Sequence, residues 1–305
     1  MSHIALATAI SAAHHDEDMP LLLEACSQAG LVAQALAWDD PTVSWGRFDA
    51  VLLRSVWNYQ LHLDGILAWC ERVDRASTLL NPLPVLRWNT DKRYLADLQA
   101  DGLPVIPGTF VDTEEEPLPA LSAFLSATPG EDGFVVKPTV GAGAADAQRY
   151  TRAQEVAAAS HIARLLDGGR NVLLQPYLPA VEQSGETALV YIDGKFSHAA
   201  RKAALLAGDG NAKAAEESIT PSIAQADELA LAERVLPTVR RRFGHDRPLP
   251  YARIDLIRGH DGDPRLLELE LTEPSLFLPT APEAAGRLAG AVSARIRLAS
   301  RSGSG

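Results

Sequence analysis

The chain has few of the residues that form disulfides or zinc sites. Among its 305 residues there are two cysteines, Cys26 and Cys70, and both fall in patterns typical of apolar helix faces. No Cys-x-x-Cys pair occurs, and the eight histidines are scattered without metal-ligand spacing. We therefore expect two buried, inert thiols rather than a disulfide, a zinc site or a cysteine nucleophile.

Long apolar runs and an excess of positive charge are also lacking. No run approaches the roughly 20 residues that cross a bilayer, and the first ten residues lack the basic start and long apolar core of a signal peptide. Lys and Arg total 28 against 39 Asp and Glu, a net charge of −11. An acidic surface repels nucleic acids and anionic membranes. We expect a cytoplasmic protein with neither partner, although a local basic pocket for a small phosphate ligand is not excluded.

The pattern of strands and helices indicates an α/β protein with three sections, residues 1–88, 89–178 and 179–305. The first section alternates strands and helices, which predicts a parallel sheet with helices on both faces. Ligands of such sheets bind beyond the carboxyl ends of the strands, where the run from Arg54 to Tyr59 falls. The expected elements are strands over 3–10 and 50–54, a helix over 18–29 that Asp18 caps, and a helix over 61–73.

Turn and cap signals divide the other two sections. In the second, we expect a helix that Thr90 caps and Gly102 ends, strands over 133–137 and 171–175, and a helix over 151–166. In the third, Asp193-Gly194 predicts a hairpin, and Asp261-Gly262 predicts a turn between strands 251–258 and 265–271. Residues 204–221 are rich in Ala, Gly and Asn and are expected to form a mobile loop over a site.

Acidic residues recur at alternate positions near the C-terminus, in Arg253-Ile254-Asp255 and Glu268-Leu269-Glu270. Alternate residues of a strand share a face, and antiparallel pairing across the Asp261-Gly262 turn would bring Asp255 near both glutamates. Three crowded carboxylates repel one another, and Mg²⁺, which prefers oxygen ligands, relieves that repulsion. The alternative is that the glutamates occupy the solvated face of an amphipathic strand.

Lys137 ends the apolar run Phe134-Val135-Val136, a position that favours a nearby anion. The small-residue loop that follows, 139–144, contains Thr139, Gly141 and Gly143, and small side chains let backbone N–H groups approach phosphate oxygens. It lacks the Gly-Lys-Ser/Thr of a Walker loop, so a plain flexible turn is the alternative. Taken singly, Lys92, Arg201 and Lys202 also fit surface charges.

A hinge-like segment joins the second and third sections. Gln175-Pro176-Tyr177-Leu178 ends an apolar strand, and its backbone groups could bind the edge of an adenine. Glu182 or Glu186 could then accept hydrogen bonds from ribose hydroxyls. A plain linker between domains is the alternative.

The order of these features along the chain resembles that of the ATP-grasp superfamily, specifically the carboxylate–amine ligases of the glutathione synthetase and D-alanine–D-alanine ligase type. The resemblance covers nearly the whole chain, and its most specific element is Arg253-Ile254-Asp255 with Glu268 thirteen residues after Asp255. It implies an ATP-grasp fold preceded by a Rossmann-like α/β domain. Two departures from the family pattern are Glu270, where Asn is common, and Pro274-Ser275-Leu276, where Pro-Gly is common.

The resemblance also implies ATP, two Mg²⁺ ions for which Mn²⁺ can substitute, and a role for each matching residue. Lys92 and Lys137 would bind the α- and β-phosphates under the 139–144 loop, and Arg201 or Lys202 would reach the γ-phosphate. Gln175, Tyr177 and Leu178 would hold the adenine, with Glu182 or Glu186 on the ribose. Asp255, Glu268 and Glu270 would bind the metals, and Arg253 would stabilise an oxyanion. Residues 204–221 would close over the site and exclude water.

Four further segments resemble the branch of the superfamily that contains the cyclo-ligase of D-cycloserine biosynthesis. They are Arg54-Ser55-Val56-Trp57-Asn58-Tyr59, Trp88-Asn89-Thr90-Asp91-Lys92, Ser197-His198-Ala199-Ala200-Arg201-Lys202 and the run from Glu268 to Phe277. The resemblance implies an ATP-dependent cyclisation of O-ureido-D-serine through an acylphosphate, releasing ADP and phosphate.

On this interpretation Arg54, Ser55, Asn58 and Ser275 would contact a small amino-acid-like substrate. An intermolecular amino-acid or dipeptide ligase and a non-catalytic ATP sensor are the two alternatives. The sequence leaves homodimer and homotetramer equally open.

Overall fold

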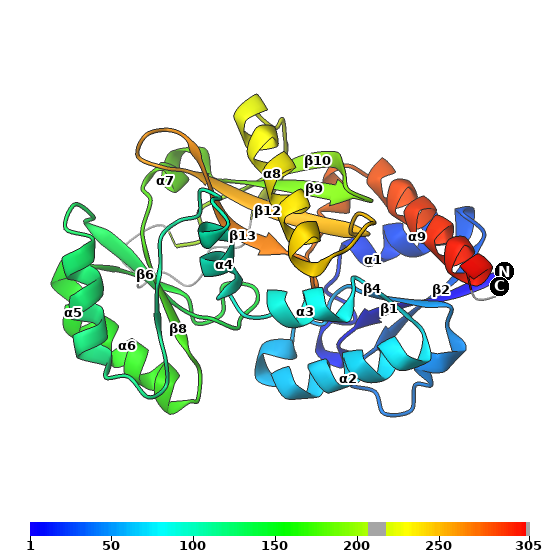
Figure 1. Cartoon of the computed structure of the whole chain (residues 1–305), viewed down its shortest axis with the longest axis horizontal. Helices are drawn as coiled ribbons and strands as arrows, with labels where there is room; N and C mark the ends of the chain where they lie inside the picture. Colours follow the sequence, from blue (N-terminus) through cyan, green and yellow to red (C-terminus); the bar gives the residue numbers. More distant parts are fainter. Residues whose placement is uncertain (207–217, 303–305) are drawn as a thin grey trace.

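The computed structural model describes residues 1–206 and 218–302, and these residues form three sheets, one within each predicted section (Figure 1). The N-terminal sheet has the strand order β2-β1-β3-β4 and is parallel throughout. Its strands are β1 (Ser2–Thr8), β2 (Leu31–Ala37), β3 (Ala50–Leu53) and β4 (Thr78–Leu80), accompanied by helices α1 (Asp18–Gln28), α2 (Leu63–Ala76) and α3 (Leu83–Asn89).

Alternate residues of β1 pack on opposite sides of this sheet. Ile4 and Leu6 share a core with α1, whereas Ala5 and Ala7 pack against residues of α2. The predicted parallel sheet with helices on both faces is thus confirmed.

The central sheet is antiparallel and has the order β5-β8-β6-β7. Its strands are β5 (Thr109–Val111), β6 (Gly133–Pro138), β7 (Gln148–Thr151) and β8 (Val172–Pro176). Helices α5 (Pro117–Ala127) and α6 (Glu155–Asp167) share its apolar core. The short helix α4 (Tyr94–Ala100) does not, because its apolar residues pack with those of the C-terminal sheet. The segment that opens the second predicted section therefore contributes to the core of the third.

The C-terminal sheet is antiparallel, with the order β11-β10-β9-β12-β13. Its strands are β9 (Glu186–Ile192), β10 (Lys195–Lys202), β11 (Ile219–Ser222), β12 (Tyr251–Arg258) and β13 (Pro264–Glu270), and its helices are α7 (Ala180–Ser184), α8 (Ala226–Phe243) and α9 (Glu283–Ser302). The predicted hairpin between β9 and β10 is confirmed: Asp193 and Gly194 have φ angles of 50° and 73°, as such a two-residue turn requires.

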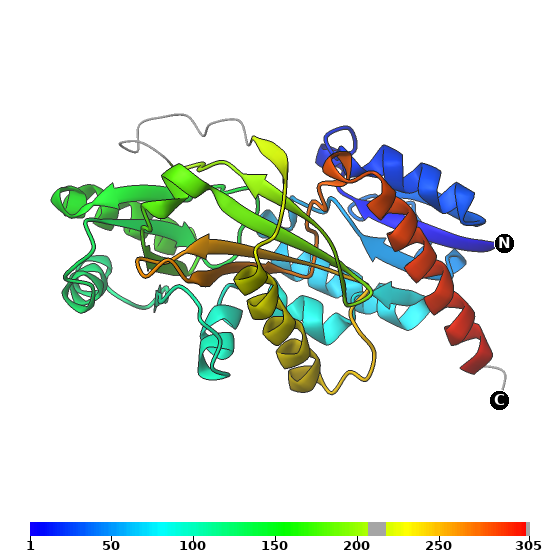
Figure 2. The same ribbon diagram turned by 90° about the horizontal axis from the view of Figure 1, so that it is seen from above.

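The last helix returns to the beginning of the chain. Leu288, Ala289 and Val292 of α9 share one apolar core with Leu22 of α1 and Ile4 of β1. Figure 2 shows α9 lying across the α1 side of the N-terminal sheet. The C-terminal residues thus complete the packing of the N-terminal section, although the sequence places them in the third.

Two predicted helix caps are wrong. Glu17 occupies the cap position of α1, and Asp18 lies inside the helix, where its buried carboxylate accepts hydrogen bonds from the backbone N–H groups of Leu276 at 2.5 Å and Leu278 at 2.7 Å. Thr90 ends α3 rather than starting a helix, and α4 begins only at Tyr94. For Asp18, contacts distant in the sequence override the local cap signal. The Thr90 hydroxyl instead donates to the carbonyl of Arg87 at 3.1 Å, within the turn that ends α3.

Both cysteines are buried and free, as predicted. Burial raises the pKa of Cys26 to about 11 and that of Cys70 to about 12, which keeps both thiols protonated and unreactive near neutral pH. Within residues 1–206 and 218–302, no helix combines the length and the apolar character needed to cross a bilayer. The predicted loop 204–221 lies largely outside the described residues, since only 204–206 and 218–221 are described.

Candidate active site

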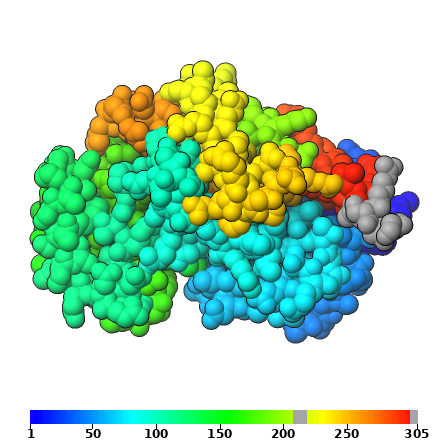
Figure 3. Space-filling view, in the orientation of Figure 1, coloured from blue at the N-terminus to red at the C-terminus, as the bar shows by residue number. Residues whose placement is uncertain are grey.

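A cavity of about 500 Å³ lies where the three sheets meet. Its wall includes Trp57 of the N-terminal section, Lys137 of β6, Gln175 of β8, Lys202 of β10 and Glu268 of β13. In the space-filling view an indentation separates the green central lobe from the blue-to-cyan N-terminal lobe (Figure 3). The volume falls within the usual range for a small-molecule site.

One end of the cavity is largely apolar. Ile106, Val135, Tyr177 and Leu178 line it together with Gln175. The side-chain amide of Gln175 donates to the carbonyl of Ile106 at 3.1 Å, which fixes this wall. An apolar slot beside the hinge suits a flat heterocycle, so the structure brings Gln175, Tyr177 and Leu178 together as the sequence predicted.

Of the two glutamates considered for the ribose, Glu186 lines the cavity and Glu182 does not. Glu182 accepts hydrogen bonds from Arg149 at 2.6 Å and from the Tyr177 hydroxyl at 3.0 Å. Glu186 forms an ion pair with Lys202 at 2.9 Å. Each carboxylate therefore has a partner within the protein.

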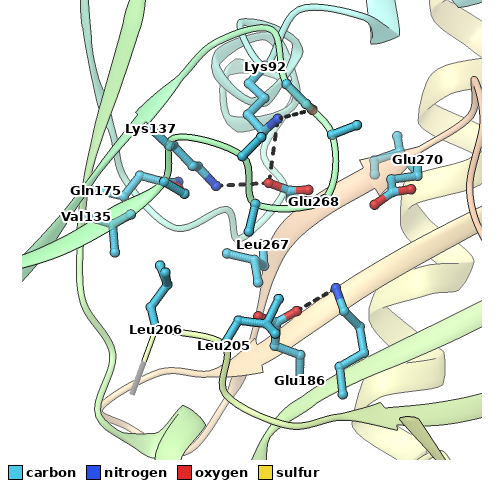
Figure 4. Close-up of a pocket in the computed structure, with 18 of the residues that line it drawn as sticks. Lys92, Val135, Lys137, Gln175, Glu186, Leu205, Leu206, Leu267, Glu268 and Glu270 are labelled. Carbon is cyan, nitrogen blue, oxygen red and sulfur yellow. Dashed lines mark hydrogen bonds and ion pairs between the residues drawn. The ribbon is translucent and has the colours of Figure 1, made fainter. Parts of the chain in front are cut away.

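Two lysines converge on one glutamate in the middle of the cavity (Figure 4). The Lys137 ammonium lies 3.0 Å from the Glu268 carboxylate and that of Lys92 lies 3.8 Å from it. Burial opposes ionisation of Glu268, but the lysine charges hold the pKa of this carboxyl well below its usual range. The predicted phosphate-binding lysines thus face a carboxylate predicted to bind metal, an arrangement suited to a magnesium–phosphate complex.

The small-residue loop after β6 is attached to the N-terminal section. The carbonyl of Gly141 accepts from the Lys92 ammonium at 3.1 Å and from the Tyr59 hydroxyl at 3.3 Å. The side-chain oxygen of Gln60 accepts from the backbone N–H of Ala142 at 2.8 Å. Gly141 and Gly143 line the cavity, whereas Thr139 is buried and donates to the Asp91 carboxylate at 3.1 Å.

A second charged group occupies the β12–β13 side of the cavity. The two strands pair antiparallel, as predicted, and a β-bulge between Asp255 and Leu256 sets Asp255 opposite Glu268 and Arg253 opposite Glu270. Asp255 is fully buried and pairs with Arg253 at 2.8 Å and with Lys202 at 3.0 Å. Arg253 also forms an ion pair with Glu270. Arg253 therefore pairs with both Asp255 and Glu270, and Lys202 pairs with Asp255.

Arg201 and Lys202 diverge because neighbouring side chains of a strand point to opposite faces. Lys202 lines the cavity, whereas Arg201 is outside its lining and donates to the Ser184 carbonyl at 2.7 Å. The structure thus favours Lys202 as the cation available to a γ-phosphate.

The donor chemistry of this cluster fits a hard divalent ion. The predicted ligands Asp255, Glu268 and Glu270 are all carboxylates, and burial together with the charges of Asp255 and Glu268 raises the pKa of Glu270 despite Arg253. Within the described ranges, no three acidic, His or Cys side chains are yet grouped closely enough to hold a metal ion. Each predicted ligand is instead paired with Lys or Arg, so binding a cation requires these pairs to open.

Glu273 lines the cavity together with Glu186, Glu268 and Glu270, although no pattern in the sequence assigned it a role. Burial, and secondarily the charge of Glu270, raises its pKa from 4.5 to about 8. Because the folded state binds this proton more tightly than the unfolded chain, the stabilisation is full below about pH 4.5 and is lost as the pH rises through about 8. A pKa difference of one between the folded and unfolded states corresponds to about 1.4 kcal/mol.

We therefore expect the metal-free protein to lose stability as the pH rises through this range, and Glu273→Gln to lose less. Urea unfolding of both proteins at several pH values in EDTA measures this difference. Parallel pH dependences of the two proteins would contradict the assignment of a raised pKa to Glu273.

The predicted substrate residues separate into two groups. Ser275 lines the cavity, together with Trp57, Tyr59 and Gln60, three residues to which the sequence assigned no role. Arg54, Ser55 and Asn58 are not part of the lining.

Those three residues instead support the cavity wall. Arg54 is buried, donates to the Pro274 carbonyl at 2.8 Å and pairs with Asp18 at 3.1 Å. Ser55 donates to the hydroxyl of Thr8, and Asn58 bonds to Trp38 and Asp39. These three residues therefore lie outside the cavity lining, and their side chains bond to neighbouring segments of the protein.

Comparison with known proteins assigns the family. Residues 4–81 match the family described as D-cycloserine synthetase DcsG, N-terminal domain. The chain is 44% identical over 298 residues to the cycloserine biosynthesis protein DcsG of Streptomyces lavendulae, covering 97% of this chain and all of that one. It superposes on the crystal structure of D-cycloserine synthetase DcsG with a TM-score of 0.93, 43% identity and coverage of 96% and 99%.

More distant structures share the fold. The ATP-grasp ligase PsnB has a TM-score of 0.64 at 21% identity, with coverage of 96% of this chain and 99% of that one. The D-alanine–D-alanine ligase of Bacillus anthracis has a TM-score of 0.66 at 14% identity over the full length of both chains. ATP-grasp ligases use ATP and a divalent metal ion. The predicted fold and resemblance are confirmed, and this chain belongs to the DcsG family of ATP-grasp ligases.

Proposed function

We propose that the protein converts O-ureido-D-serine to D-cycloserine with consumption of ATP. The observation that carries this proposal is the 44% identity, over nearly the whole length of both chains, to a protein named for cycloserine biosynthesis. The cavity supports it, because one continuous space of about 500 Å³ adjoins both the lysine cluster and the N-terminal residues Trp57 and Tyr59. A nucleotide and a small amino acid can therefore meet within it.

In the proposed reaction, the substrate carboxylate attacks the γ-phosphate and becomes an acylphosphate, and a nitrogen of the same molecule then attacks the acyl carbon. Lys92, Lys137 and Lys202 would neutralise the phosphate charge. Arg253 would stabilise the oxyanion of the tetrahedral intermediate. Gln175, Tyr177 and Leu178 would hold the adenine. Glu186 would receive the ribose, a choice supported by its presence in the cavity lining, from which Glu182 is absent.

Two Mg²⁺ ions, or Mn²⁺ in their place, would be held by Asp255, Glu268 and Glu270. When bound, they would supply positive charge to the phosphate oxygens. The residues around them would exclude water, which protects an acylphosphate from hydrolysis. We further propose that the enzyme acts in the cytoplasm as a homodimer or homotetramer, on a small amino-acid-like substrate and without nucleic-acid or membrane partners.

The test is to incubate the enzyme with ATP, Mg²⁺ and O-ureido-D-serine as the single organic substrate. We expect ADP, phosphate and D-cycloserine, identified by mass spectrometry and by comparison with an authentic standard. A product that forms only when a second amino acid is added would favour an intermolecular ligase. Binding of ATP without ADP release, across a panel of amino acids and dipeptides, would favour a sensor; either result overturns the proposal.

A further inference from the structure

We propose that Glu273 is the base that accepts the proton of the attacking nitrogen during ring closure, an inference that rests on the proposed cyclisation. The position of Glu273 in the cavity wall carries this proposal. It lies just beyond the end of β13, is 9% exposed and lines the cavity. Trp57, another lining residue, donates its indole N–H to the backbone carbonyl of Glu273 at 3.2 Å.

The charges around Glu273 differ from those around the other carboxylates of the cavity. Glu186, Glu268 and Glu270 each form an ion pair with Lys or Arg. Glu273 forms none with any residue of the described ranges. Because a neighbouring cation weakens the basicity of a carboxylate, Glu273 retains more proton affinity than its neighbours.

The groups that act electrostatically on Glu273 come from several elements. Burial and the charge of Glu270 raise its pKa to about 8, whereas the charges of Lys92 and Arg253 and a hydrogen bond with Tyr59 act in the opposite direction. A base whose pKa lies close to the working pH is efficient in proton transfer. The raised pKa of Glu273 is therefore consistent with the role of base, which its position in the cavity wall suggests.

Other residues of the cavity are less suited to this role. Among the described lining residues there is neither a His nor a Cys. Burial and the charge of Glu273 raise the pKa of the Tyr59 phenol well above its usual value, so that it remains a donor. Carboxylate charges raise the pKa of Lys202 despite its burial, and this side chain remains an ammonium.

Arg253, the group proposed to stabilise the oxyanion, contacts two residues that closely follow Glu273 in the sequence. Arg253 donates to the carbonyl of Ser275 at 2.9 Å, and its guanidinium lies over the ring of Phe277. Ser275 and Phe277 line the cavity with Glu273, so one short segment of the wall carries the proposed base and contacts the oxyanion group. A substrate whose acyl carbon and nitrogen belong to one small molecule can contact both.

The proposed step is balanced without any further reactant. The nitrogen attacks the acyl carbon and the new C–N bond forms. The C–O bond to phosphate breaks, and the phosphate leaves with that electron pair. The proton of the nitrogen passes to a carboxylate oxygen of Glu273, from which it returns to solvent.

The experiment compares the wild-type enzyme with Glu273→Gln, which keeps the shape of the side chain but cannot accept the proton. Each enzyme is incubated with ATP, Mg²⁺ and O-ureido-D-serine, with and without hydroxylamine. The amounts of ADP and D-cycloserine formed are then measured in the same reaction. We expect cyclic product to fall by about 10²–10⁴-fold, the usual contribution of a general base. ADP release should fall much less, and hydroxylamine should trap the accumulated acylphosphate as a hydroxamate. Glu283→Gln, an exposed change at the start of α9, is the matched control.

Product formation at the wild-type rate in Glu273→Gln would overturn the proposal. An equal loss of ADP and product without hydroxamate would also overturn it, because Glu273 would then act before the acylphosphate forms. Urea unfolding of Glu273→Gln shows whether the variant is folded, and Glu273→Asp in the same assay should restore part of the coupling between ADP and product. If the wild-type enzyme makes no cyclic product, the proposed function itself fails, a result distinct from either of these.

Discussion

Glu268→Gln is expected to lower ATP-dependent turnover by about 10²–10³-fold, the scale on which a preorganised electrostatic group contributes to catalysis. The Glu268 carboxylate lies within ion-pair distance of both Lys92 and Lys137. It is also one of the three carboxylates that would hold the metal ions. Glutamine preserves the size of the side chain but removes the charge, so the lysines lose a common partner and the metal loses a ligand.

Steady-state ADP release over a range of Mg²⁺ concentrations measures this effect. We expect both a lower kcat and a higher Mg²⁺ requirement, because a neutral amide is a poorer ligand for a hard cation. Glu114→Gln, in the exposed connector of the central section, is the control and should behave as the wild type. Unchanged turnover and Mg²⁺ dependence in Glu268→Gln would rule out the assigned metal and phosphate role.

Asp18→Ala is expected to reduce the free energy of unfolding by about 3–5 kcal/mol, the usual result of removing one partner from a buried ion pair. The Asp18 carboxylate accepts from Arg54 and from the backbone N–H groups of Leu276 and Leu278. Its loss leaves the buried Arg54 charge uncompensated and releases the segment that carries Ser275 and Phe277. We therefore expect lower activity together with lower stability.

Urea unfolding measures the change, with the exposed neighbour Glu17→Ala as the matched control at the start of the same helix. The control should change stability by no more than about 0.5 kcal/mol. Adding Arg54→Met to Asp18→Ala should recover part of the loss, because it removes the unpaired charge. An unchanged unfolding midpoint in Asp18→Ala would show that the buried network does not stabilise the fold.

The part of the site on neighbouring strands could be predicted from the sequence. The spacing of Arg253 and Asp255, the Asp261-Gly262 turn and the spacing of Glu268 and Glu270 predict an antiparallel pair of strands, and the structure has that pair. The β-bulge between Asp255 and Leu256, which sets Asp255 opposite Glu268, could not be predicted from the spacing. Alternation in a strand is a local rule, so it can be applied without knowledge of the fold. The cationic partners of these carboxylates could not be predicted in the same way, because they come from β6, β10 and the turn before α4.

The residues that the sequence left unassigned depend on distant contacts. Trp57 and Glu273 are 216 positions apart, and only the fold brings the indole to the carbonyl. A single acidic residue such as Glu273 has no periodic pattern that distinguishes it from a surface residue. Its burial arises from the packing of the N-terminal section against the C-terminal strands, which a local pattern does not encode.

The strand β2, Leu31–Ala37, is an element of the fold that could not be predicted from local sequence. Its sequence, Leu-Val-Ala-Gln-Ala-Leu-Ala, consists mainly of residues that favour helices. It is nevertheless a strand because it pairs in parallel with β1 along seven positions. Tertiary pairing outweighs a weak local propensity in this segment.

The return of α9 to the N-terminal sheet affects the order in which the chain can fold during its synthesis. The strands β1 to β4 leave the ribosome first, but the apolar face that Ile4 and Leu6 share with Leu288 and Val292 stays uncovered on the α9 side until the last helix is made. Chains generally fold domain by domain from the N-terminus as they emerge. In this protein the packing of the first sheet requires the last helix, so the native N-terminal unit is completed only after Leu288 and Val292 have been translated.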